Sequence, residues 1–428
     1  MNKLHKYAFA DLYDISSGIS STKEQAGHGA PFASFSTVFN NYFLPDELPD
    51  LMDTSEQDQE VYSIKKGDIL ITRTSETADE LAMSCVALKD YPRATYSGFL
   101  KRLRPKTTGI AYYKYMAFFL RSKYFRKVIN NNTIMTLRAS FNEDIFSFLT
   151  LYLPDYEEQV KIGDMLYSLE KKIQVNSRVN DNLRQMARTT FDYWFTQFDF
   201  PDNSGNPYRS TGGRLIWNEA AKKNLPVGWR CTKMVSAIEG IRTGLNPRDN
   251  FTLGGGDIRY ITVKNLRTDG SLDYSGCDTI SEAARKIVHR RSAVSVGDIL
   301  FASIAPLGRC YLVQTAPVDW DINESVFSIR SNTAEVTTEY LYMHLQSEAF
   351  IKEATACSTG SIFKGIRINS LMDSKIVLPP MHIMERFSHE VQPILAMQSK
   401  LNAENQELVQ LRDWLLPVLM NGQASVSD

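Results

Sequence analysis

The chain has 428 residues, of which 43% are hydrophobic and 23% are charged, and its formal net charge is −1. A chain of this length holds two or three domains, each large enough for its own core. The sequence excludes a membrane protein, because it has neither an apolar signal segment nor the ~18 consecutive apolar residues of a span. Five scattered cysteines without metal-ligand spacing indicate reduced thiols in a cytoplasmic protein.

Charge is unevenly distributed along the first half. Seven acidic and no basic residues lie between Asp46 and Glu60, whereas eleven Lys and Arg and no acidic residue lie between Tyr91 and Arg138. The basic run is interleaved with aromatic residues and favours a nucleic-acid-binding face, because a polyanion responds to local potential. Alternatively, the two runs are solvated faces of one domain that pair with each other.

In the first half, strands are predicted over 61–72 and 84–88, which are rich in β-branched residues. Residues 112–128 have helical spacing. A strand over 148–153 ends at Pro154, and a long helix follows it. The first half is therefore predicted to be a mixed α/β domain.

In the second half, strands are predicted over 259–264, 297–303 and 309–314, with a turn at 306–308. A helix over 338–353 and a strand over 373–378 follow, and Pro379 ends that strand. The Gly- and Pro-containing segment from 200 to 224 is the predicted boundary between the halves.

The two halves repeat each other. Residues 66–70 and 296–300 share the pattern Gly-Asp-Ile-Leu, and Leu153-Pro154 returns as Leu378-Pro379. Five further residues recur with an offset of 225 positions, namely Tyr115, Leu120, Ser122, Phe125 and Lys127. An offset of half the chain indicates two copies of one unit, since solenoid repeats have periods of ~20–50 residues.

A coiled-coil seam follows each Leu-Pro, with alternating steps of four and three residues. In the first helix the seam is Ile162, Leu166, Leu169, Ile173, Asn176, Asn180, Leu183 and Ala187. In the second helix it is Phe387, Val391, Ile394, Gln398, Leu401, Asn405, Leu408 and Arg412. A buried amide at Asn180 or Asn405 could fix the register. The alternative is two unrelated amphipathic helices, each packed on its own domain.

Motifs for catalysis are incomplete. Leu378-Pro379-Pro380-Met381 lacks the Asn or Asp and the aromatic residue of an adenine methyltransferase loop. The segment 360–365 begins like a P-loop, but Ile366-Arg367 stands where Lys-Ser/Thr is required. The six histidines form no metal-spaced pair. No catalytic residue and no cofactor or metal ligand is predicted in this chain.

Several segments, taken in order, resemble the specificity subunits of type I restriction–modification systems. The segment 185–199 is similar to the end of the family's central helix, and 225–229 resembles the entry to its second recognition domain. Further similar segments are 243–248, 297–300, 358–361, 376–380 and 411–422. The first half departs from the pattern, because it has no Leu-Pro-x-Gly-Trp entry and no Ser-Thr-Gly loop.

The resemblance implies an α+β fold. Two mixed α/β target-recognition domains, related by pseudo-two-fold symmetry, would be separated by an antiparallel coiled coil of two long helices. The predicted domains are 1–154 (first recognition domain), 155–200 (central spacer helix), 201–380 (second recognition domain), 381–422 (C-terminal spacer helix) and 423–428 (tail).

The resemblance also implies a function without catalysis by this chain. Each recognition domain would read one half of a split double-stranded DNA sequence. Two methylation subunits would carry S-adenosylmethionine and modify adenine, and restriction/translocase subunits could join. No membrane partner is expected.

Arg and Lys in strand turns and loops are the expected DNA contacts, since such side chains reach phosphates and guanine edges. For the first domain the expected contacts, which include one threonine, are Arg73, Lys101, Arg102, Arg104, Thr136 and Arg138. For the second domain they are Lys264, Arg267, Arg290, Arg291, Arg309, Lys364 and Arg367. Two other hypotheses stay open: a protein–protein scaffold built on the paired helices, without DNA binding, and a stand-alone nuclease or methylase.

Overall fold

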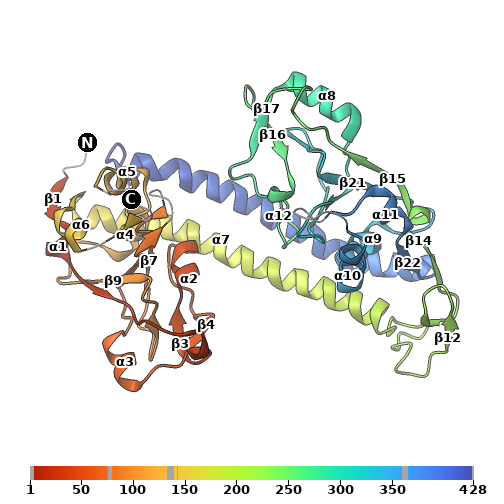
Figure 1. The fold of residues 1–428 in the computed structure, drawn as a ribbon, viewed down its shortest axis with the longest axis horizontal. Coiled ribbons are helices and arrows are strands. Elements are labelled where there is room, and N and C mark those ends of the chain that lie inside the picture. The colour runs from red at the N-terminus through yellow and green to blue at the C-terminus, as the bar shows by residue number, and fades with distance from the viewer. Residues whose placement is uncertain (1–3, 76–79, 133–138, 142, 359–364, 427–428) are drawn as a thin grey trace. The chain divides into compact units, whose positions relative to one another are not determined.

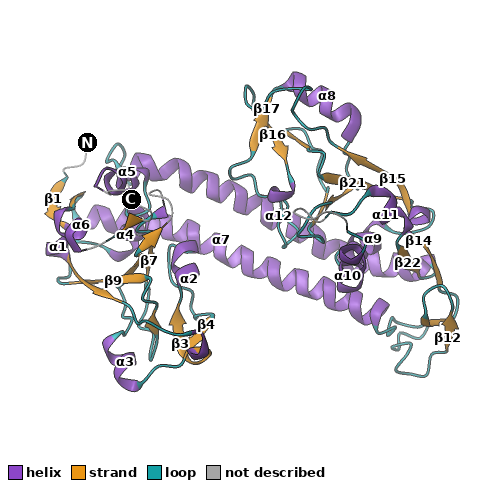
Figure 2. Cartoon of the chain, in the orientation of Figure 1, coloured by secondary structure: helices purple, strands orange, loops and turns teal. Residues whose placement is uncertain are grey.

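A computed structural model of the chain describes residues 4–75, 80–132, 139–141, 143–358 and 365–426 (Figure 1). Helices and strands are mixed throughout (Figure 2). The chain forms two compact units: unit 1 is Met1–Gln174 with Gln406–Asp428, and unit 2 is Val175–Asn405. No helix among the described residues is both long enough and apolar enough to cross a membrane.

The two long helices are α7 (Tyr156–Phe191) and α12 (Met381–Met420), and each contributes one part to each unit. The other elements of unit 1 are, in chain order, β1 (His5–Ala8), α1 (Phe9–Leu12), β2 (Tyr13–Ser17), η1 (Lys23–Gln25), β3 (Ala26–Ala33), α2 (Phe35–Asn40), β4 (Asp50–Met52), α3 (Glu56–Val61), β5 (Ile69–Thr72), β6 (Thr74–Ser75), β7 (Ser84–Val86), β8 (Thr95–Tyr96), β9 (Leu100–Pro105), α4 (Tyr113–Phe119), α5 (Lys123–Asn132), β10 (Ala139–Ser140), α6 (Glu143–Phe148) and β11 (Thr150–Leu153).

Unit 2 has a π-helical turn directly after α7, η3 (Asp192–Thr196). Its other elements are β12 (Leu215–Asn218), β13 (Lys223–Pro226), β14 (Arg230–Lys233), η4 (Met234–Ala237), β15 (Ile238–Thr243), β16 (Ile258–Ile261), η5 (Val263–Asn265), β17 (Asp278–Ile280), α8 (Glu282–Ser292), β18 (Ile299–Ala302), β19 (Cys310–Leu312), β20 (Trp320–Ile322), β21 (Val326–Ser331), α9 (Thr338–Leu345), α10 (Glu348–Ala356), α11 (Ile368–Asp373) and β22 (Lys375–Leu378).

The two units have the same sheet topology. The antiparallel four-stranded sheet has the order β2-β9-β5-β7 in unit 1 and β15-β21-β18-β19 in unit 2. A three-stranded sheet accompanies each, with the order β4-β3-β8 or β17-β16-β20, and its last strand is parallel to the middle one. The two-stranded antiparallel sheets β1-β11 and β14-β22 also correspond. The predicted duplication is therefore present strand by strand in these three sheets, to which the described residues add the pairs β6-β10 in unit 1 and β12-β13 in unit 2.

A buried ion pair is duplicated together with the sheet. In unit 1, Asp68 is 1% exposed and accepts Arg104 Nε at 2.8 Å and Nη2 at 2.6 Å. In unit 2, Asp298 is 2% exposed and accepts Arg330 Nε at 2.7 Å and Nη2 at 2.9 Å. A bidentate guanidinium donates to both oxygens of the buried carboxylate and balances its charge away from water. The pair joins the turn before β5 or β18 to the neighbouring strand.

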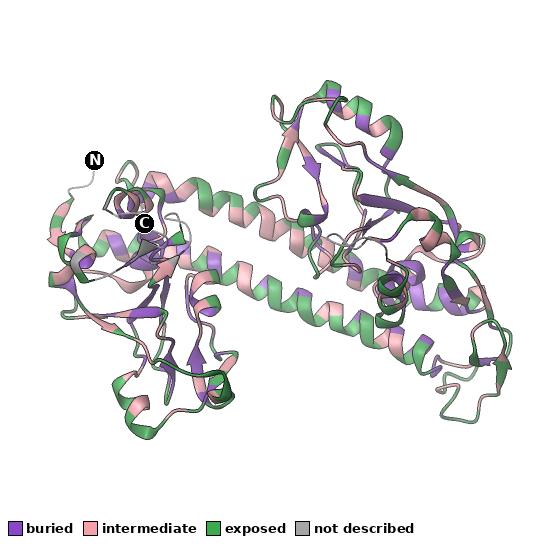
Figure 3. Cartoon of the chain, in the orientation of Figure 1, coloured by how far each residue is buried: buried purple, intermediate pink, exposed green. Residues whose placement is uncertain are grey.

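Both long helices have buried positions (Figure 3), and apolar residues of each helix belong to the cores of the two units. In unit 1, Ile162 and Leu166 of α7 share a core with Leu416 and Leu419 of α12. In unit 2, Phe191 of α7 shares a core with several residues of α12, namely Ile383, Met384, Phe387, Val391 and Leu395. These residues include the apolar ends of both predicted seams.

The middle of the seam in unit 2 is polar. Asn176 is 2% exposed and donates from Nδ2 to Asn405 Oδ1 and to Glu404 Oε2, both at 2.9 Å. Asn180 donates from Nδ2 to Asn402 Oδ1 at 2.7 Å. The partners of α12 decrease in number as those of α7 increase, so the helices are antiparallel here. Paired amides fix a register because a slipped helix would leave them buried without partners.

The predicted α+β class, with two mixed α/β units and two long helices, is confirmed. Several element predictions were too long. The strand over 61–72 is only Ile69–Thr72, and Val61 instead ends α3, whose N-cap is Ser55. The helices over 112–128 and 338–353 are each broken into two, at 120–122 and at 346–347. In each unit a serine before the second helix, Ser122 or Ser347, accepts a hydrogen bond from a backbone N–H of that helix, which starts it anew.

Candidate nucleic-acid interface

Four segments of unit 1 meet at one end of the four-stranded sheet. The backbone N–H of Arg73 donates to the carbonyl of Phe99 at 2.8 Å, and the N–H of Phe141 donates to the carbonyl of Arg73 at 2.8 Å. The N–H of Gly98 donates to the carbonyl of Ile19 at 2.7 Å. These bonds hold together the ends of β2 and β5, the start of β9 and the segment before α6. We call this region the sheet end of unit 1.

Unit 2 has the equivalent sheet end. The N–H of Ser303 donates to the carbonyl of Ser325 at 3.1 Å, and the N–H of Ile366 donates to the carbonyl of Ser303 at 2.8 Å. The N–H of Gly244 donates to the carbonyl of Asn323 at 3.1 Å. Arg73 and Ser303 thus hold the same position in the two units.

Each sheet end requires one glycine. A Cβ atom on Gly18 would lie 2.1 Å from the carbonyl oxygen of Ser97, and one on Gly244 would lie 1.7 Å from that of Ile322. Only a residue without a side chain allows this approach of two backbones. Gly244 belongs to the segment 243–248 that resembles the family pattern, and its equivalent, Gly18, went unnoticed in the sequence.

Exposed side chains at the sheet end of unit 1 suit contact with a polyanion. Arg73 is exposed, and Phe99 beside it is 63% exposed. A guanidinium can form a fork of hydrogen bonds to a phosphate or a guanine edge, and an aromatic ring can stack on or wedge between bases. Sequence reasoning missed Phe99; the signal was a lone aromatic residue directly after Gly98 between two strands.

Three of the predicted contacts in unit 1 are held inside the unit. Lys101 is 6% exposed and donates from Nζ to Ser17 Oγ at 2.9 Å. Arg102 donates from Nη1 to the carbonyl of Ser63 at 2.5 Å. Arg104 binds Asp68, and this hydrogen bond raises the pKa of its guanidinium. Their contact with DNA stays a prediction, and the geometry gives each of them a structural role. Thr136 and Arg138 lie outside the described residues.

Two further residues of the basic run, Arg121 and Lys114, are also bound inside the unit. Arg121 donates to four backbone carbonyls, those of Ser84, Val38, Phe39 and Asn41, at 2.6 to 2.9 Å. Lys114 Nζ lies 2.7 Å from Asp164 Oδ1. A sequence scan counts such cations as surface charge, because it cannot see that carbonyls at chain turns bind them.

The described residues among those predicted for unit 2 lie in three places. Arg309 follows the turn between β18 and β19, and its Nη1 lies 3.4 Å from the carbonyl of Leu266, which brings it next to the loop of Lys264 and Arg267. Lys264 is exposed, and Arg267 is paired with Asp273 at 2.7 Å. Arg367 is exposed and directly follows Ile366 at the sheet end.

The remaining predicted residues of unit 2 lie elsewhere. Arg290 and Arg291 are exposed in the last turn of α8, where cations also complement the helix dipole. Lys364 lies outside the described residues. The sheet end, with the exposed Arg367, is therefore the best-defined candidate interface of this unit.

Among the described residues, no group of three or more His, Cys, Asp or Glu side chains could hold a metal ion. His344 packs between the rings of Tyr340 and Phe350. Burial lowers its pKa to about 4, and the positive charge of Lys223 adds to this effect. The imidazole is therefore neutral, as expected for a histidine in a helix core.

Each of the two similar α/β units thus presents an exposed arginine at its sheet end, Arg73 or Arg367, which suits contact with a polyanion. Residues 5–185 match the type I restriction modification DNA specificity domain. The chain is 24% identical over 368 residues to the type I restriction enzyme MjaIX specificity subunit of Methanocaldococcus jannaschii, covering 85% of this chain and 79% of that one. It is also 24% identical to the HindI specificity subunit of Haemophilus influenzae, covering 96% and 98% of the two chains.

The fold agrees with these matches. A crystal structure of a type I restriction–modification S subunit from M. genitalium covers 98% of this chain, with 96% of its own length, a TM-score of 0.60 and 14% sequence identity. Over most of its length, the chain is thus similar in sequence to the specificity subunits of type I restriction–modification systems.

Proposed function

We propose that this chain is the DNA sequence-specificity subunit of a type I restriction–modification complex and binds a bipartite target through its two units. The observation that carries the proposal is the strand-by-strand duplication of a recognition unit in a chain of this family. Two similar heads fit a target with two half-sites. The chain itself would supply recognition and no bond-making step.

In this proposal the sheet ends face DNA. Arg73 and Phe99 contact one half-site, and Arg367 with Arg309 contacts the other. Lys264, Arg290 and Arg291 add phosphate contacts, which strengthen binding without reading sequence. Lys101, Arg102 and Arg104 support the sheet from inside. This division separates residues that set specificity from those that hold the frame.

The long helices would set the distance between the half-sites. Seven residues inserted into each of α7 and α12 would lengthen both by ~10 Å, and the gap between recognised half-sites should widen by about three base pairs. An unchanged gap would refute this role.

The helices also offer two equivalent docking faces. Met186 on the α7 part of unit 2 is 55% exposed, and Leu411 on the α12 part of unit 1 is 44% exposed. They are 225 positions apart and thus occupy equivalent sites. We assign these faces to two methylation subunits, which would carry S-adenosylmethionine and modify adenine in a cytoplasmic complex that restriction/translocase subunits can join.

The test is sequence-specific binding by the reconstituted complex. Methylation mapping of host DNA with and without this chain should show one bipartite motif that depends on it. Replacing Arg73 by Ala should relax the motif in one half only, and replacing Arg367 by Ala should relax the other half. A complex that binds random and genomic DNA equally at ~0.15 M salt would exclude the proposal.

A further inference from the structure

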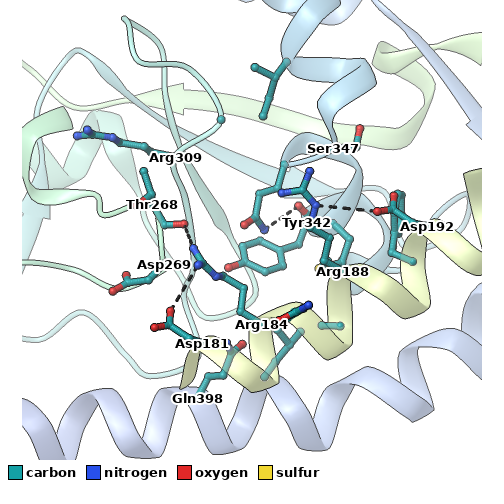
Figure 4. Close-up of a pocket in the computed structure, with 18 of the residues that line it drawn as sticks. Asp181, Arg184, Arg188, Asp192, Thr268, Asp269, Arg309, Tyr342, Ser347 and Gln398 are labelled. Atoms are coloured by element: carbon teal, nitrogen blue, oxygen red, sulfur yellow. Dashed lines mark hydrogen bonds and ion pairs between the residues drawn. The ribbon is translucent and has the colours of Figure 1, made fainter. Parts of the chain in front are cut away.

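A pocket of about 500 Å³ opens in unit 2 between α7, α9, α10, α12 and the loop that carries Thr268 (Figure 4). Apolar side chains line much of it: Ala187, Phe191, Leu307, Tyr342, Met343 and Leu395. Its two α7 arginines are already paired. Arg184 lies 3.4 Å from Asp181 and donates to the carbonyl of Thr268 at 2.7 Å, and Arg188 lies 3.9 Å from Asp192.

The duplication shows what the corresponding place holds in unit 1. There the ring of Tyr42 lies 5.1 Å from the guanidinium carbon of Arg412 and 5.0 Å from that of Arg121. The ring centre of Phe118 lies 4.9 Å from that of Tyr42. Arg412 in turn donates to Glu170 at 2.8 Å. The ring of Tyr42 is therefore surrounded by two cations and a second ring, and we call these residues, together with Glu170, the Tyr42 site. Burial raises the pKa of the Tyr42 hydroxyl.

Every residue of the Tyr42 site has its equivalent in the pocket. Shifted by 225 positions, Arg412, Arg121, Phe118 and Glu170 become Ala187, Gln346, Met343 and Leu395, and all four line the pocket of unit 2. The substitutions replace long charged side chains by shorter and uncharged ones. The pocket is thus the wider and more apolar counterpart of the Tyr42 site.

The backbone beside the pocket completes the correspondence. In unit 1, the segment of Tyr42 runs along the edge strand β7: the N–H of Val86 donates to the carbonyl of Tyr42, and the N–H of Leu44 donates to that of Val86, both at 2.9 Å. The equivalent of Val86 in the edge strand β19 is Leu312, since the two residues pair with Ile69 and Ile299 in the same register.

Leu312 presents the same free edge. The N–H of Val313 donates to the carbonyl of Asp298 at 2.9 Å, as that of Ala87 does to Asp68, so the N–H and carbonyl of Leu312 point away from β18. Among the described residues, no backbone group hydrogen-bonds to Leu312 on that side. An unpaired strand edge next to a pocket for one side chain is the geometry that binds extended peptides.

We propose that unit 2 binds an extended segment of a partner protein, which pairs with β19 at Leu312 and places a tyrosine or phenylalanine ring in the pocket. The proposal rests on the proposed function, in which this chain works within a complex. An aromatic ring fits because shorter, uncharged side chains stand here in place of the two arginines that surround Tyr42. Arg184 and Arg188 have carboxylate partners, and Arg309, which also lines the pocket, donates to the carbonyl of Leu266. The segment 41–44 of unit 1 is the internal example of such a ligand.

The first experiment uses that segment as the probe. A fluorescent peptide with the sequence of residues 40–46 is titrated against the full chain by fluorescence polarisation, next to a peptide with Ala in place of Tyr42. Ala187→Trp fills the pocket, and Leu312→Pro removes the edge N–H. Each change, in peptide or protein, should weaken binding at least about tenfold. Thr189→Trp is the matched control, since it adds the same ring at an exposed position of the same helix outside the pocket lining, and it should bind normally.

The second experiment uses the assembled complex, with p-benzoylphenylalanine in place of Gln346. Irradiation should cross-link a partner peptide that contains Tyr or Phe. Equal binding of both peptides, or a cross-link that goes only to this chain or to DNA, overturns the proposal. DNA binding is measured on the same variants: intact specificity with no cross-link refutes the peptide site alone, whereas lost specificity in the unaltered complex refutes the proposed function.

Discussion

The helices α3 and α8 occupy the same place in the two units and carry opposite charge. Each follows the edge strand of a three-stranded sheet, β4 or β17. Each also precedes the aspartate of the duplicated ion pair, Asp68 or Asp298. The helix of unit 1 has Glu56, Asp58 and Glu60, whereas that of unit 2 has four cations: Arg285, Lys286, Arg290 and Arg291.

The buried frame of the units differs far less. Both keep the sheet order, a glycine at the sheet end and a carboxylate bound by two guanidinium nitrogens. A surface helix can exchange its charges at little cost in folding free energy, while a buried pair cannot lose one member. The buried features that the two units share therefore serve folding, whereas the surface charges that differ between them can serve recognition.

The largest expected effect is the loss of the shared ion pair. Asp298→Ala leaves Arg330 partly buried without its carboxylate and should lower the free energy of unfolding by about 3–5 kcal/mol. Asp68→Ala should cost a similar amount through Arg104. Urea unfolding of the full chain, followed by circular dichroism, measures both.

The control for this prediction is an exposed ion pair of the same unit. Lys233 Nζ lies 2.7 Å from Asp373 Oδ1, and both side chains are about two-thirds exposed. Asp373→Ala should change the free energy of unfolding by less than about 1 kcal/mol. A small effect at Asp298 would mean that the duplicated pair does not hold the frame.

Much of this frame could be predicted from the sequence, because local patterns carry it. The Leu-Pro stops, the seam of the long helices and the repeat of Gly-Asp-Ile-Leu are all short-range signals. Gly-Asp-Ile-Leu marks the carboxylate of the ion pair, yet its arginine lies 36 or 32 positions later along the chain. No local pattern connects the two.

The candidate site was harder to predict for the same reason. Arg73, Phe99 and Phe141 are neighbours only because three separated segments meet at the sheet end. Charge counting selected Lys101 and Arg104, whose partners Ser17 and Asp68 come from other strands or turns. The charge of a side chain can be read from the sequence, whereas the residue that binds this side chain in the fold cannot.

The second largest expected effect concerns one position in the aromatic clusters of the two units, which is phenylalanine in unit 1 and histidine in unit 2. Phe119 of unit 1 packs against Tyr115 and Phe125, and its equivalent in unit 2 is His344, between Tyr340 and Phe350. The pKa of His344 is lowered to about 4 by burial, whereas in the unfolded chain it has its ordinary value near 6.5. The unfolded state therefore binds more protons between these values. Stability is fully present above about pH 6.5 and falls as the pH decreases towards 4.

His344→Phe should remove this acid sensitivity. The gain should reach about 2–3 kcal/mol at pH 4 relative to the unaltered chain. It should also be visible at pH 7, because the buried Nε2 atom of His344 has no hydrogen-bond partner among the described residues. Melting temperatures from pH 4 to 8 measure it, and exchange of the exposed His389 for Asn should leave the profile unchanged. Parallel profiles for the unaltered chain and His344→Phe would contradict a buried neutral imidazole.

The smallest expected effect tests the opposite charges of α3 and α8 directly. Arg290 and Arg291 are exposed, and their positions in the last turn serve the helix only weakly. If α8 faces phosphates, replacing both by Ala should weaken DNA binding about tenfold at ~0.15 M salt and reduce the slope of log K against log salt by roughly 2. The recognised motif should not change, since phosphate contacts carry no base information.

The matched experiment on α3 decides whether the difference belongs to recognition. Replacing Glu56 and Glu60 by Gln removes two negative charges from the equivalent helix of unit 1. If α3 lies near DNA as α8 does, its acids repel phosphates, and affinity should rise about as much as it falls on α8. No change on α3 together with a loss on α8 would mean that the two units approach DNA differently, although their sheets correspond strand by strand.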